Sequence, residues 1–185
     1  MRLTARDKAI LRKVERCKWL TTSQIQRQFF PGVSLDPVRK RLRKLAEAKY
    51  LQSYQQHQMS ELLHGQGKPP KQIEHLVAIN DIRIAAEKGQ VAFFYACWEL
   101  PAFGWEYPVI PDAVCGIGET VHLVEYDRGT EGHEQLQKKF AQYACFDFEY
   151  ALLLCAETQK RLLKLRALAP CKQVIFKLMA DIRNM

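Results

Sequence analysis

The chain has 185 residues, 48% hydrophobic and 26% charged, which is the composition of an ordinary globular protein with one or two domains. No stretch approaches the roughly 18 consecutive apolar residues of a membrane span, and the N-terminal residues lack the apolar core of a secretory signal. We therefore expect a cytoplasmic protein without a membrane partner.

Positive charge is concentrated in the first part of the chain. Residues 1–75 contain 16 Lys and Arg against 6 Asp and Glu, whereas residues 76–185 contain 12 against 14. This asymmetry predicts that the N-terminal part binds a polyanion and that the C-terminal part has a different role.

The six cysteines are far apart and never form a Cys-x-x-Cys pair, so we expect reduced side chains in the core rather than zinc ligands or disulfides. They are Cys17, Cys97, Cys115, Cys145, Cys155 and Cys171.

Two capping boxes predict two helices near the N-terminus. Thr4 with Asp7 is the first box, and Thr21 with Gln24 is the second. The expected helices span residues 5–17 and 22–29.

A third expected helix has a dense positive face. Asp36 is its expected N-cap, Pro37 suits the first helical position, and the apolar pattern continues to about residue 48. A third helix of this kind is typical of a helix-turn-helix protein, in which it enters the major groove of DNA. The alternative is a solvated amphipathic face. The cations are Arg39, Lys40, Arg41, Arg43 and Lys44.

A wing is expected after the three helices. Residues 51–56 predict one strand and residues 73–79 predict its return strand, with a Gly- and Pro-rich loop between them. Lys68 and Lys71 in this loop suit contacts with phosphates or the minor groove. We therefore expect a winged helix-turn-helix domain over residues 1–78 that binds double-stranded DNA.

The remaining residues, 79–185, predict an α/β domain with a mixed central sheet. The expected order is a helix, three strands, a helix, a strand, a helix and a strand. The apolar run at 150–155 is typical of a strand that is covered on both faces.

Acidic side chains interrupt the apolar pattern of the strand expected at 120–127. Because side chains alternate along a strand, Glu125 and Asp127 are expected on the same face. Asp112, in the preceding hairpin strand, is expected to join them in a three-carboxylate pocket for Mg²⁺ or Mn²⁺. The alternative is a turn cap at Asp112 and a solvated strand end.

The sequence Pro111-Asp112 followed by Glu125-Tyr126-Asp127 resembles the motif of the PD-(D/E)xK superfamily, whose core is the restriction-endonuclease-like fold. This superfamily places a lysine where the chain has Asp127. Some members of the superfamily carry the lysine in the following helix, so the resemblance implies this role for Lys138 or Lys139, and a role for Glu99 as an additional metal-binding carboxylate. The alternative is that these side chains are solvated at the surface.

The chain is also similar to the replication-relaxation family of plasmids and other mobile elements over about residues 3–178. The segments that resemble it are Leu20 to Ile25, His75 to Asp81, Pro111-Asp112-Ala113 and Glu125 to Glu131. This resemblance implies a DNA-binding protein that acts in replication or relaxation.

Three functions are consistent with these features. The first is a DNA-binding protein whose nuclease-like domain is degenerate or an assembly module, with a homodimer or other replication or mobilisation proteins as partners. The second is a Mg²⁺-dependent nickase or endonuclease in which Asp112, Glu125 and Asp127 bind the metal and Glu99 and Lys138 assist. The third is a transcriptional regulator.

Overall fold

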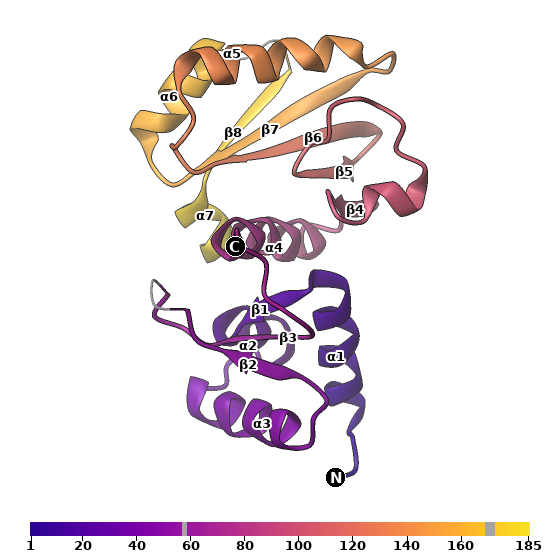
Figure 1. The fold of residues 1–185 in the computed structure, drawn as a ribbon, viewed down its shortest axis with the longest axis vertical. Coiled ribbons are helices and arrows are strands. Elements are labelled where there is room, and N and C mark those ends of the chain that lie inside the picture. The colour runs from indigo at the N-terminus through magenta and orange to yellow at the C-terminus, as the bar shows by residue number, and fades with distance from the viewer. Residues whose placement is uncertain (57–58, 169–172) are drawn as a thin grey trace. The chain divides into compact units, whose positions relative to one another are not determined.

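The computed structural model describes residues 1–56, 59–168 and 173–185, so Cys171 lies outside the described residues (Figure 1). The chain divides into two compact units, Met1–Asn80 (unit 1) and Asp81–Met185 (unit 2). The division falls within helix α4, Ile73–Lys88.

Unit 1 contains three helices before α4 and a three-stranded antiparallel sheet with the strand order β1-β3-β2. The helices are α1 (Ala5–Cys17), α2 (Thr22–Phe29) and α3 (Leu35–Glu47), and the strands are β1 (Trp19–Thr21), β2 (Gln52–Tyr54) and β3 (Leu63–Gly65).

Both predicted capping boxes are confirmed. The backbone N–H of Thr4 donates to Asp7 Oδ2 at 2.7 Å, and that of Thr21 donates to Gln24 Oε1 at 3.0 Å. The expected cap of α3 is wrong, because its N-cap is Ser34 and Asp36 lies inside the first turn. Helix α3 therefore begins earlier than its Asp-Pro pair predicts.

The expected return strand at residues 73–79 is also wrong, because these residues form the start of α4. Ile73, Leu76 and Val77 are buried, and their spacing of three and four residues places them on one helical face. The return strand is instead β3. Lys68 and Lys71 consequently lie in the exposed β3–α4 link, outside the β2–β3 hairpin.

His64 of the central strand β3 contacts two neighbouring elements of unit 1. Its Nε2 lies 3.0 Å from Thr22 Oγ1 and its Nδ1 lies 3.1 Å from Ser53 Oγ, so it connects α2 and β2 through β3. Burial lowers the pKa of His64 to about 4, and the ring is therefore neutral at physiological pH.

Unit 2 is built on a five-stranded mixed sheet, and a mixed central sheet is what the sequence predicts. The strand order in this sheet is β4-β5-β6-β7-β8. The first three strands are antiparallel, whereas β7 and β8 run parallel to β6. The strands are β4 (Phe93–Ala96), β5 (Ala113–Ile117), β6 (Thr120–Asp127), β7 (Tyr150–Ala156) and β8 (Val174–Leu178). The helices are α5 (His133–Gln142), α6 (Gln159–Leu168) and α7 (Met179–Asn184), with 3₁₀ turns at Leu100–Phe103 and Tyr143–Cys145.

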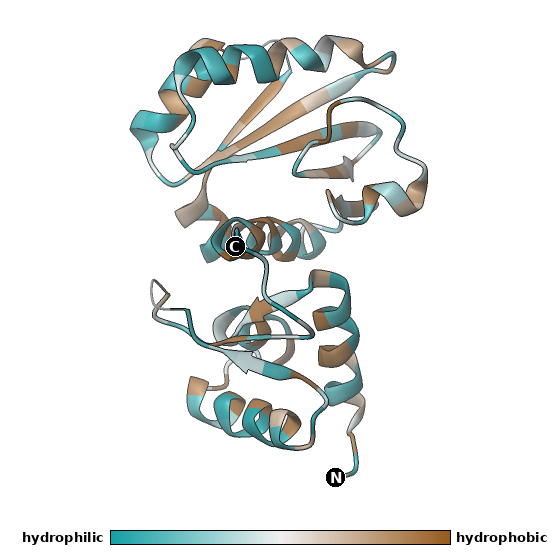
Figure 2. Ribbon diagram, in the orientation of Figure 1, coloured by the Kyte–Doolittle hydropathy of each residue, from teal (hydrophilic) through white to brown (hydrophobic). Residues whose placement is uncertain are grey.

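Helices cover both faces of this sheet, with α5 and α6 on one face and α7 and the C-terminal part of α4 on the other (Figure 1). Because side chains alternate, Leu123, Leu152 and Leu154 pack in the core beneath α5 and α6. Figure 2 shows that the strands are largely apolar and that the helices have hydrophilic stretches. The described part of the chain contains no helix with the length and hydropathy needed to cross a membrane.

Candidate functional site

Asp112, directly before β5, lies next to Glu125 of the adjacent strand β6. Ala113 of β5 pairs with Val124 of β6, and this antiparallel register places Asp112 opposite Glu125. Asp112 Oδ2 also accepts the backbone N–H of Tyr126 at 2.8 Å. The structure thus brings together two of the three expected carboxylates.

Helix α5 and the turn after it complete a cluster around these carboxylates. The Tyr143 hydroxyl donates to Glu125 Oε1, and Lys139 Nζ forms an ion pair with Glu125 Oε2. Only 3% of Glu125 is exposed. We call Asp112, Glu125, Lys139 and Tyr143 the carboxylate–lysine site.

The electrostatics of the site favour a proton or a cation at Glu125. Burial and then the neighbouring charge of Asp112 raise the pKa of Glu125 to about 8, although Lys139 and Tyr143 act in the opposite direction. Burial disfavours the charged form of Lys139, but the carboxylates of Glu125 and Asp112 outweigh it and raise the pKa of Lys139 above its usual value. Lys139 therefore stays an ammonium.

The two lysines of α5 have different surroundings. Lys138 is exposed, whereas Lys139 reaches the buried Glu125. The sequence contains a signal for this difference. Lys139 follows the buried Leu136 by three residues and precedes Tyr143 by four, and residues with this spacing lie on one side of a helix. The sequence contains no signal for the hydrogen bond from Tyr143 to Glu125.

Asp127 lies on the same face of β6 as Glu125 but has a different partner. Arg161 Nε of α6 donates to Asp127 Oδ2 at 2.6 Å, and the N–H of Gly129 donates to Asp127 Oδ1 at 2.6 Å. Arg161 also donates to the carbonyl of Glu131 at 2.7 Å. These contacts attach the end of β6 to α6.

Glu99 is held by a buried cation of α4. It forms an ion pair with Arg83, whose side chain is fully buried, and accepts the N–H of Ala96 at 2.8 Å. Within the described ranges, no three His, Cys, Asp or Glu side chains gather as a metal cluster. The expected grouping of Asp127 and Glu99 with the other two acids is therefore not formed.

The two adjacent carboxylates fit a Mg²⁺ ion, which proteins commonly bind through one or two carboxylates together with water and substrate phosphates. A cation between Asp112 and Glu125 would remove the repulsion that contributes to the raised pKa of Glu125. Lys139 supplies a fixed ammonium at the same place, suited to stabilise developing negative charge.

The cations of α3 divide into two groups. Lys40, Arg43 and Lys44 are exposed on the side of the helix away from its buried apolar stripe, and Arg39 pairs with the exposed Asp36 at 3.2 Å. These four side chains remain accessible to solvent.

Arg41 is different, because it binds an acid of its own unit. Its Nε donates to Asp7 Oδ1 at 2.7 Å and its Nη2 contacts Asp7 Oδ2. Asp7 is 1% exposed, and the Arg41 guanidinium holds the pKa of that carboxyl well below its usual range. Arg41 therefore joins α3 to α1, and no sequence pattern signals this contact.

Among the described residues, no two cysteines form a disulfide. Cys17, Cys115 and Cys155 are buried, Cys97 is half-buried and Cys145 is exposed.

The fold and the site define an α/β protein with a mixed sheet and a buried carboxylate–lysine cluster, together with a separate, basic helical unit. The sequence model of the replication-relaxation family matches residues 66–149, so the chain is similar to this family over that segment. The match contains the whole carboxylate–lysine site, and it excludes α1, α2 and α3. Comparisons with curated proteins and with solved structures give no match.

Proposed function

We propose that the chain is a DNA-binding protein acting in the replication or relaxation of a plasmid or other mobile element. On this proposal, residues 1–78 form a winged helix-turn-helix domain whose third helix contacts duplex DNA. Residues 79–185 form a restriction-endonuclease-like domain that serves as an assembly module. The family match supports the biological role.

The observation that carries the proposal is the exposed positive face of α3. Lys40, Arg43 and Lys44 form no ion pair among the residues that the structure describes, and they lie opposite the buried stripe of Val38, Leu42 and Leu45. A helix fixed on one side and cationic on the other suits the phosphate backbone. The sequence between β2 and β3, residues 55–62, contains no Lys or Arg, so on this proposal α3 supplies the main contacts.

The test is the salt dependence of DNA affinity. Replacing Lys40, Arg43 and Lys44 with Ala should weaken duplex binding and reduce the slope of log affinity against log salt by about 0.9 for each lost phosphate contact. The matched control removes the same number of positive charges from unit 2, by replacing the exposed lysines Lys138, Lys160 and Lys164 with Ala. Equal slopes for the α3 variant and the unchanged chain would refute α3 as the docking helix.

A transcriptional regulator would differ from an origin-associated protein in the DNA sequence that it binds. It would bind one operator near a promoter, and removing it would change transcription while leaving plasmid copy number unchanged. An origin-associated protein would instead change copy number or plasmid topology.

The carboxylate–lysine site supports a second candidate function, a Mg²⁺-dependent DNA nickase or endonuclease. When bound, Mg²⁺ would supply charge neutralisation at the phosphate and an activated water. Asp112 and Glu125 would hold the ion, and Lys139, rather than Lys138, would stabilise negative charge at the phosphate. The contact between Lys139 and Glu125 is the observation that favours this candidate.

Cleavage of supercoiled plasmid with Mg²⁺ or Mn²⁺ tests this second function. Asp112→Asn and Lys139→Met should abolish nicking, whereas Lys138→Met should leave it unchanged, with folding of each variant checked by circular dichroism. If no tested metal and substrate give cleavage, the nickase or endonuclease function is rejected and the role as a non-catalytic assembly module remains.

A further inference from the structure

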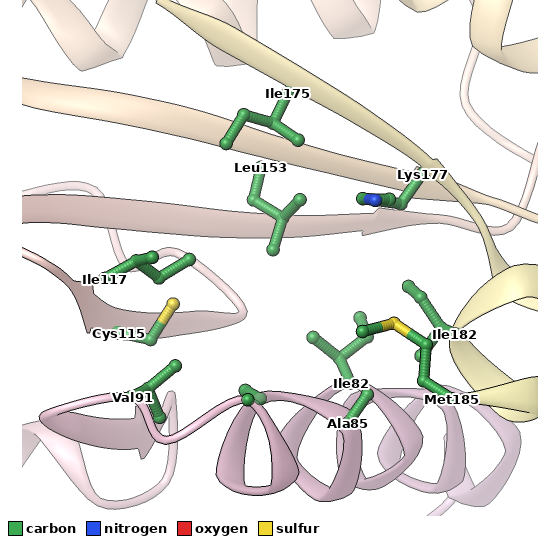
Figure 3. Close-up of a pocket in the computed structure, with 12 residues that line it drawn as sticks. Ile82, Ala85, Val91, Cys115, Ile117, Leu153, Ile175, Lys177, Ile182 and Met185 are labelled. Carbon is green, nitrogen blue, oxygen red and sulfur yellow. The ribbon is translucent and has the colours of Figure 1, made fainter.

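An apolar cavity of about 200 Å³ lies in unit 2, on the sheet face opposite the carboxylate–lysine site (Figure 3). Helices α4 and α7 form one side of it, and strands β5, β7 and β8 form the other. Ile82, Leu153 and Ile182 are among its lining residues. Aliphatic walls of this kind disfavour water and accept an apolar group.

The rim of the cavity is apolar as well. Ile117 of β5 is 42% exposed and Ile175 of β8 is 37% exposed, although both belong to the lining. Exposed aliphatic side chains beside an apolar cavity mark a binding surface rather than an ordinary solvated face. The rim therefore gives an apolar ligand access from solvent.

Lys177 is the only charged side chain among the lining residues. It follows Ile175 by two residues along β8, so both project from the same face, and Figure 3 shows its amine pointing into the same space. In the described ranges of the chain, no carboxylate pairs with it. The one other titratable side chain among the lining residues is the thiol of Cys115, which burial keeps neutral by raising its pKa to about 12.

We infer that this cavity binds a small amphipathic carboxylate, with its aliphatic chain among the apolar side chains and its carboxylate at Lys177. A lone ammonium is a compact point charge that matches one singly charged head group, whereas a phosphate site would be expected to gather several donors. The inference is independent of DNA binding and of the carboxylate–lysine site, because the cavity uses the other face of the sheet.

Titration of the full chain with straight-chain carboxylates from butanoate to decanoate tests the inference by calorimetry. Affinity should rise about fourfold for each added methylene, which corresponds to about 0.8 kcal/mol of buried CH₂, until the cavity is filled. Octanoate should bind more tightly than octanol or octylammonium.

Two variants separate the head group from the tail. Lys177→Gln should reduce octanoate affinity to that of octanol, and Ala85→Leu, which fills the cavity from α4, should weaken both. Lys160→Gln, an exposed lysine of α6, is the matched control and should bind as the unchanged chain does.

Three results would overturn the inference: no saturable binding of any chain length, equal affinity for octanoate and octylammonium, or unchanged octanoate binding by Lys177→Gln. A stable dimer that octanoate does not dissociate, together with no octanoate binding, would assign the apolar rim to a second copy of the chain instead.

Discussion

The role of each acidic side chain in unit 2 is decided by the cation that it meets. Glu125 meets Lys139 beside a second carboxylate, Asp127 meets Arg161, and Glu99 meets Arg83. Only the first arrangement leaves two adjacent carboxylates competing for one ammonium. A proton or a metal ion can relieve that competition, whereas the other two pairs are already neutral overall.

Sequence reasoning could predict which face of β6 carries the acids, because the alternation of a strand is fixed by its geometry. It could not predict their partners. Arg161 lies 34 residues after Asp127, and the meeting of the two depends on where α6 crosses the sheet. The same holds for Arg41 and Asp7, which are also 34 residues apart.

Arg41 gives a prediction about stability rather than binding. Arg41→Ala should destabilise unit 1 by about 2–3 kcal/mol, because Asp7 would remain buried without its guanidinium. Lys40→Ala, on the exposed side of the same helix, is the matched control and should leave the free energy of unfolding within about 0.5 kcal/mol of its original value. Urea unfolding of both variants measures the difference, and equal stabilities would contradict the structural role of Arg41.

Elements with a local signal were predicted most accurately. The capping boxes fix the starts of α1 and α2, and the apolar run at 150–155 corresponds to β7. The strand prediction for residues 73–79 is wrong because a short apolar run fits a strand or a buried helix equally well. Its helical spacing becomes clear only when residues up to Lys88 are taken together as α4.

Strand β3 shows why a glycine is required within a short strand. A Cβ at Gly65 would lie 2.2 Å from Trp19 Cδ2 and 2.6 Å from the carbonyl oxygen of Lys18. The Trp19 ring therefore packs directly on the backbone of β3. No local pattern in the sequence announces this contact.

Gly65→Ala should accordingly destabilise unit 1. The overlap with Trp19 and with the backbone of Lys18 cannot be relieved by one flexible side chain, so we expect a loss of about 1–3 kcal/mol. For a unit of this size, each kcal/mol corresponds to about 4–8 °C in melting temperature. Gln52→Ala, at the exposed register partner of Gly65 in β2, is the control. A melting temperature for Gly65→Ala equal to that of this control would show that the strand accommodates a methyl group.

In the whole molecule, the stabilities of the two units depend on pH in opposite directions. Unit 1 contains His64, whose pKa is lowered by burial, so its stability is lost as pH falls from about 6.5 towards 4. Unit 2 contains Glu125, whose pKa is raised by burial, so its stability is greatest below about 4.5 and declines as pH rises towards 8. Lowering the pH therefore acts on the two units with opposite sign.

Calorimetry of the full chain should consequently show two transitions whose separation changes with pH. Between pH 7.5 and pH 5, the transition of unit 1 should move to lower temperature and that of unit 2 to higher temperature. Glu125→Gln should abolish the pH response of unit 2 and leave that of unit 1 intact. A single transition, or a Glu125→Gln chain with both responses unchanged, would contradict this assignment.

Asp7 has two tasks at once, because the carboxylate that closes the capping box of α1 also receives the guanidinium of α3. Asp7→Asn would keep an oxygen for the cap while removing the negative charge. A substitution at this single position would weaken the attachment of α3 to α1 and leave the exposed cationic side chains of α3 unchanged.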